Sequence, residues 1–128
     1  MVERKHLVSG IVGAMVAMAA VGGVHAATAP APKAYVVAEF TVTDPATYKS
    51  YAPQAAAIVA RHGGVYIARG GRTVSVEGAP PADRVVLIEF PSLAAAQAFE
   101  ASPEYRAIAP IRQRASKGRV FLVEGAQP

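Results

Sequence analysis

The chain has 128 residues, a formal net charge of +4 and no cysteine or tryptophan. This length fits one domain, and the lack of cysteine excludes disulfides, thiolate metal sites and a cysteine nucleophile. A mild positive excess is a matter of solubility, whereas a nucleic-acid-binding protein needs a basic stripe. We therefore expect no nucleic-acid partner.

The first 26 residues have the pattern of a secretory signal peptide. Arg4 and Lys5 precede an uncharged apolar run at 7–21, and the segment ends in "VHA" at residues 24–26. A charged start, an apolar run and small residues before a cleavage point are the features of such a signal. We expect cleavage after Ala26 and a periplasmic or secreted protein without membrane attachment. The alternative is a retained anchor, since the run approaches the ~20 residues that span a bilayer.

Residues 27–33, "ATAPAPK", are rich in alanine and proline and predict an extended linker before a domain at 34–128. His6 and His25 leave with the signal, so His62 is the remaining imidazole. A multi-histidine metal site within one chain is thereby excluded. We expect neither a metal nor another cofactor.

The first half of the domain alternates strands with one long helix. Residues 34–42 are β-branched and aromatic, which predicts a strand. Asp44 before Pro45 marks a helix start, and the helix should run to about His62 before glycines end it. "VYIAR" at 65–69 and "RVVLIEF" at 84–90 predict two more strands.

The second half repeats the same pattern. Ser92 is the expected cap of a second helix, and Ser102 before Pro103 restarts it. Pro110 should interrupt the restarted segment into two short helices, 103–109 and 110–116, because proline lacks an amide proton. "GRVFLVEG" at 118–125 closes the chain as a strand. The order predicts an α+β, ferredoxin-like βαββαβ fold with a four-stranded antiparallel sheet covered by helices on one side.

Both faces of the predicted sheet are apolar. In the strands at 34–42 and 84–90, one alternating set is wholly apolar and should pack on the helices, and the other is apolar except for a single glutamate in each strand. Such a second face is too apolar to be left in water. We therefore expect it to be covered by a partner.

Five stretches together resemble the family called domain of unknown function 1330, which belongs to the dimeric α+β barrel superfamily. They are "VTDPATYKSYA", "RHGGVYIARGG", "VVLIEFPSLAAAQAF", "SPEYRAIAPIR" and "GRVFLVEG". The resemblance implies a ferredoxin-like protomer whose open sheet face closes against a second copy as a homodimer, forming a dimeric α+β barrel. It implies no established reaction, because wider relatives include cofactor-independent monooxygenases, isomerases and haem-binding enzymes.

Glu39, Glu89 and Arg69 are the leading candidates for a site. Strand alternation places all three on the expected interface face, with the two glutamates near the same ends of adjacent strands. Two carboxylates in a dry place raise one pKa and make a general acid or base. Arg69 would then receive an anionic ligand. The alternative is a buried ion-pair network that fixes the register of the dimer.

Three further residues are candidate ligand contacts. Tyr51 lies on the apolar stripe of the first helix, where a core tyrosine with a bonded hydroxyl is the plainer interpretation. His62, at that helix's end, could act as a general base or as a haem ligand. Arg112 is the arginine of "PIR", and it could bind an anion or pair with Glu100, Glu104 or a partner's acid.

Two hypotheses of function follow. In the first, the homodimer is a cofactor-free isomerase or monooxygenase acting on a small acidic or aromatic molecule. In the second, it is a non-catalytic periplasmic binding or stress-related protein that holds such a ligand.

Overall fold

The computed structural model describes residues 29–128, and the predicted signal peptide lies outside this range. Residues 31–128 form one unit. Its elements are β1 (Ala34–Val42), α2 (Pro45–Arg61), β2 (Val65–Arg69), β3 (Arg84–Phe90), α3 (Leu93–Ala101), α4 (Pro103–Ala115) and β4 (Ser116–Glu124). The four strands form one antiparallel sheet in the order β2-β3-β1-β4. The predicted ferredoxin-like α+β fold is therefore confirmed, and none of the helices described is long and apolar enough to span a membrane.

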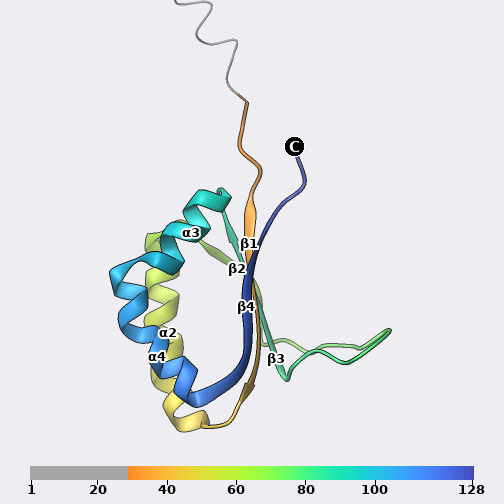
Figure 1. Cartoon of the computed structure of the whole chain (residues 1–128), viewed down its shortest axis with the longest axis vertical. Coiled ribbons are helices and arrows are strands. Elements are labelled where there is room, and N and C mark those ends of the chain that lie inside the picture. Colours follow the sequence, from red (N-terminus) through yellow and green to blue (C-terminus); the bar gives the residue numbers. More distant parts are fainter. Residues whose placement is uncertain (1–28) are drawn as a thin grey trace, which may run out of the picture. The chain divides into compact units, whose positions relative to one another are not determined.

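All three helices lie on one side of the sheet, and the other side is open (Figure 1). Both ends of α2 lie where the capping residues in the sequence predict them. The Asp44 side chain accepts a hydrogen bond from the backbone N–H of Thr47 at 3.1 Å, which caps the first turn. At the other end Gly63 has φ +78°, and Gly64 N–H donates to the Val59 carbonyl at 2.9 Å. This pairing satisfies carbonyls that the helix end would leave free.

The prediction of two short helices around Pro110 is wrong. α4 runs without a break from Pro103 to Ala115 with Pro110 inside it. The carbonyl that loses its partner is that of Arg106, an exposed residue, so water can satisfy it. Ile108 and Ala115 are buried on the opposite side of α4, which packs mainly against α2, and this packing outweighs the proline's cost.

The core lies between the sheet and the helices. The expected inward sets of β1 and β3 are buried, Phe40 at 3% and Phe90 at 1% exposed. Phe99 of α3 stacks between Phe90, at 5.2 Å between ring centroids, and Tyr105 of α4, at 4.5 Å. These contacts fix the helices over the sheet and leave a hollow beside them.

Candidate functional site

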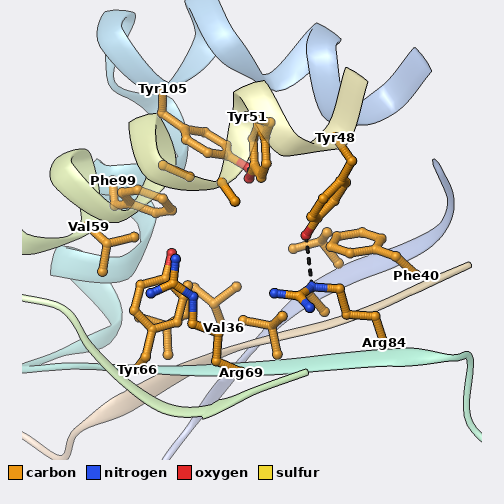
Figure 2. A pocket seen from close by; sticks show the side chains of 16 residues that line it. Val36, Phe40, Tyr48, Tyr51, Val59, Tyr66, Arg69, Arg84, Phe99 and Tyr105 are labelled. Atoms are coloured by element: carbon orange, nitrogen blue, oxygen red, sulfur yellow. Dashed lines mark hydrogen bonds between the residues drawn. The ribbon is translucent and has the colours of Figure 1, made fainter. Parts of the chain in front are cut away.

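A pocket opens between α2 and the inner face of the sheet. Its floor consists of aliphatic side chains from the strands, and its roof carries tyrosines from the helices (Figure 2). The lining residues are Val36, Ala38, Phe40, Tyr48, Tyr51, Ala52, Ala55, Val59, Tyr66, Arg69, Arg84, Val86, Ile88, Phe99, Tyr105 and Val120. An apolar hollow with a few converging polar groups is the usual form of a small-molecule site.

The pocket is small and opens to solvent at a mouth. Its volume is about 40 Å³, which gives room for roughly three water molecules. A ligand larger than this must occupy the mouth, where the arginine side chains lie.

Two tyrosines meet at the roof. The hydroxyls of Tyr51 on α2 and Tyr105 on α4 are 2.7 Å apart and buried. Burial raises the pKa of Tyr51, and the neighbouring Tyr105 raises it further. The Tyr51 phenol therefore stays neutral and hydrogen-bonded at physiological pH, which agrees with the core role weighed for it from the sequence.

Two arginines rise from the sheet toward these tyrosines (Figure 2). Arg84 Nε donates to the Tyr48 hydroxyl at 3.1 Å, and the Arg69 guanidinium lies 4.3 Å from the centre of the Tyr66 ring. Neither arginine forms an ion pair with a carboxylate within residues 29–128. Both guanidinium groups thus bring positive charge to an apolar pocket that supplies no acid to neutralise it.

Arg69 reaches this pocket because β2 carries a bulge, and its predicted place beside the glutamates is wrong. In the ladder to β3, Tyr66 pairs with Ile88 but Ala68 pairs with Leu87, so Ile67 is an extra residue. The extra residue reverses the alternation that follows. Arg69 consequently pairs with Val86 on the inner face.

Glu39 and Glu89 do lie on the open face, but they do not meet. Glu39 pairs across β1–β3 with Val85, whereas Glu89 pairs with Tyr35 near the other end of the ladder. The expectation that they share one end is wrong, because the strands are antiparallel and equal positions along them lie at opposite ends.

Each glutamate forms an ion pair with a separate cation, and neither lies beside the other carboxylate. Glu89 Oε1 accepts from Lys33 at 3.0 Å, and Glu39 Oε2 accepts from Arg119 Nη2 at 2.8 Å. The N–H of Ala82 also donates to Glu39. The Arg119 hydrogen bond, followed by that from Ala82, lowers the pKa of Glu39, which is opposite to what a shared pair of carboxylates requires.

Arg112 does not line the pocket but lies next to it. Its guanidinium stands 4.8 Å from the centre of the Phe40 ring, and its Nε is buried without a hydrogen-bond partner among the described residues. The anchor to Glu104 considered from the sequence is not formed, because Glu104 bonds to Arg61 and His62. Arg112 adds positive charge to the same region as the roof hydroxyls.

His62 lies outside the pocket. Its Nε2 is 3.0 Å from a Glu104 oxygen, and its ring packs edge-on against Phe99 at 5.9 Å. With Arg61 it ties the end of α2 to the start of α4. Among residues 29–128 there is no group of three or more histidine, aspartate or glutamate side chains placed to share a metal ion.

Arg84, Tyr66 and Tyr105 also line the pocket, and none of them was predicted from the sequence as a site residue. The inward position of Arg84 could have been predicted, since alternation along β3 puts it on the same face as Val86 and Ile88. A charged side chain at the start of an apolar inward set marks a point where the core opens to water. Tyr66 and Tyr105 look like ordinary core aromatics, and their convergence depends on tertiary packing.

The arrangement suits a small anion with an apolar body. Guanidinium groups bind carboxylates through paired N–H donors, and the tyrosine rings offer stacking surfaces. Among the lining residues there is no aspartate, glutamate or histidine. A proton acceptor within this set would have to be a tyrosine.

Comparison with known proteins gives the family and the fold. A family model described as domain of unknown function (DUF1330) matches residues 33–126. No curated protein gives a significant match.

Two solved proteins have similar structures. The RPA0582 protein of unknown function from Rhodopseudomonas palustris has a TM-score of 0.61 at 20% identity, covering 84% of this chain and 93% of its own. SnoaB, a cofactor-independent oxygenase from Streptomyces nogalater, has a TM-score of 0.55 at 23% identity, covering 77% of this chain and 97% of its own. At these identities the likeness establishes the fold alone, a ferredoxin-like α+β fold.

Proposed function

The chain belongs to the DUF1330 family, and from its pocket we propose that it is an exported homodimer that binds a small organic acid in each protomer. The observation that carries the proposal is the pair of arginines, Arg69 and Arg84, which line an apolar pocket without a carboxylate partner among the described residues. A cation held near apolar surface attracts a ligand that brings the missing negative charge.

The ligand's body is set by the rest of the lining. Tyr48 and Tyr66 hold their rings beside the two guanidinium groups, and the floor is aliphatic. An aromatic or branched aliphatic acid would place its carboxylate at the mouth and its apolar end toward Val36 and Val59. Long or highly charged ligands do not fit a hollow of this depth.

A thermal-shift screen tests this proposal. Benzoate-like and short branched carboxylates should raise the Tm of the wild type, and the matched amides and alcohols should not. Saturating ligand at about 100 times Kd corresponds to ~2.7 kcal/mol of stabilisation. Arg69→Gln or Arg84→Gln should weaken binding by roughly 10- to 100-fold, as for a lost charged hydrogen bond.

Arg114→Gln is the matched control, since Arg114 is an exposed α4 residue that does not line the pocket. Binding unchanged in both pocket variants, or no acid that stabilises the wild type, would contradict the proposal.

A catalytic use of the pocket is the second candidate, favoured by one contact. Arg84 donates to the Tyr48 hydroxyl, and a cation beside a phenol or an enolised ligand stabilises negative charge on oxygen. The fold shared with SnoaB, a cofactor-independent oxygenase, makes oxygenation the reaction to examine first. Oxygen uptake with an acid that binds should distinguish this enzyme from a non-catalytic binding protein, with Tyr48→Phe as the variant expected to lose turnover.

Export and dimerisation are the remaining parts of the proposal. The signal-like first 26 residues support export, and intact-mass spectrometry of the periplasmic or secreted protein should give an N-terminus at Ala27. The open sheet face supports a homodimer, since Val65 is 58% and Phe121 is 42% exposed there. Burying about 800 Å² per partner is typical of a stable interface. Sedimentation as a monomer at micromolar concentration would contradict the dimer.

A further inference from the structure

The segment between β2 and β3, residues 70–83, projects as an arm on the side of the sheet away from the helices (Figure 1). Every residue from Gly71 to Pro81 is exposed. The arm is tied only at its base, where Gly70 N–H donates to the Val85 carbonyl and Ala82 N–H to Glu39. Within the described chain, residues 71–81 make no other hydrogen bond to protein.

The arm carries a strand pattern without a strand partner. Residues 73–77 read "TVSVE", with β-branched residues and strict alternation of apolar and polar positions. Val74 is 73% and Val76 is 93% exposed. The large exposed hydrophobic residues of residues 29–128 lie on this arm or on β2 and β4 of the sheet. The arm therefore continues the apolar surface of the open face.

The β4 strand offers a matching edge. It is an outer strand that pairs only with β1, so one side of its backbone is free within the described chain. Phe121 and Val123 are 42% and 46% exposed and pair with Val37 and Tyr35, which places them on the open face two residues apart. A free edge with apolar neighbours is a template for another strand.

We propose that residues 73–77 of the arm pair antiparallel with the β4 edge of a second copy, with Val76 beside the partner's Phe121 and Val74 beside the partner's Val123. This inference rests on the proposed homodimer. The direction follows from charge. Antiparallel pairing sets Glu77 opposite the partner's Val120, whereas parallel pairing, with Val74 beside the partner's Phe121 and Val76 beside the partner's Val123, sets Glu77 opposite the partner's Glu124. Like charges directly opposite each other across two strands destabilise the pair, so the parallel arrangement is disfavoured.

Cross-linking tests the pairing directly, because the chain has no native cysteine. Val76→Cys and Phe121→Cys protomers are co-expressed with different tags and treated with a short bismaleimide. A covalent dimer carrying both tags is expected in high yield. Pairing Val76→Cys with Gln113→Cys, an exposed position on α4, should give none. A native dimer that yields no more product with Phe121→Cys than with Gln113→Cys overturns the arm pairing and leaves the homodimer intact.

A second measurement is independent of cysteine chemistry. Val74→Asp together with Val76→Asp should raise the dimer Kd by about 10- to 100-fold while the circular dichroism spectrum is unchanged, since both side chains are exposed in the single chain. Ser75→Asp, one residue away on the other face of the extended segment, is the matched control and should shift the Kd far less. Equal Kd values for the wild type and the double variant overturn the proposal, whereas a monomeric wild type refutes the homodimer itself.

Discussion

The two faces of the sheet differ in whether their charged side chains form ion pairs. On the open face each glutamate is paired with a cation from its own chain, Lys33 with Glu89 and Arg119 with Glu39. On the inner face Arg69 and Arg84 have no such acid among the described residues. An apolar partner can cover a surface with paired charges at a lower electrostatic cost than one with unpaired charges. Unpaired cations in a hollow can instead bind an anion.

The arm connects the two faces. Arg69 immediately precedes it and Arg84 immediately follows it, while Glu39 holds its base from the open side. The strand that carries one pocket arginine is thus continued by the segment that we propose contacts a second copy. The pocket and the proposed interface therefore share a frame without sharing side chains, so variants of each should have separable effects.

The largest expected effect comes from charging the open face. Leu87 lies in the middle of β3 and pairs with Val37, so Leu87→Asp places an unpaired carboxylate in the proposed interface. We expect the dimer Kd to rise at least ~100-fold, about 2.7 kcal/mol, measured by analytical ultracentrifugation. Gln113→Asp on the exposed side of α4 is the control. A Leu87→Asp protein that remains dimeric at the same dilution would show that the open face is not the interface.

A substitution on the inner face should lower the free energy of unfolding, and its effect should be smaller than that of Leu87→Asp on the dimer. Tyr51→Phe leaves the buried Tyr105 hydroxyl without its 2.7 Å partner, and an unpaired buried hydroxyl costs roughly 1–2 kcal/mol. Urea unfolding should register this loss with the dimer state unchanged.

The double variant with Tyr105→Phe sharpens the interpretation. Because it removes both hydroxyls, its loss should be smaller than the sum of the two single losses. Strict additivity would mean that the hydroxyls do not depend on each other.

Local sequence signals predicted most of the fold. Asp44, Ser92 and Ser102 act as caps as expected, since a cap depends only on residues within one turn. The prediction at Pro110 failed because a helix break is decided by tertiary packing as well as by the proline. Alternation identified the inner face of β1 and β3, where no bulge disturbs the period.

The candidate site was less predictable for two physical reasons. The bulge at Ile67 depends on the pairing of β2 with β3, and a single extra residue there moved Arg69 to the other face. Glu39 and Glu89 were placed on the correct face, but their separation depends on the antiparallel register. Side-chain convergence across helices, as for Tyr51 and Tyr105, has no short-range signal at all.

The smallest expected effect concerns Glu100, a half-buried acid. The experiment tests whether burial or the charge of Arg112 has the larger influence on the pKa of Glu100. Burial raises the pKa of Glu100, and the positive charge of Arg112 opposes that shift. Since the folded pKa is above the unfolded one, the stabilising contribution of the protonated form is fully present below the unfolded pKa and is lost as pH rises through the folded pKa. Glu100→Gln removes this loss, so its Tm should exceed that of the wild type at pH 7 and match it near pH 4. Scanning calorimetry at both pH values measures the difference. If attraction to Arg112 outweighed burial, the variant would instead melt below the wild type at pH 7, and the buried charge of Arg112 would be balanced by this acid, leaving less of it to attract a ligand.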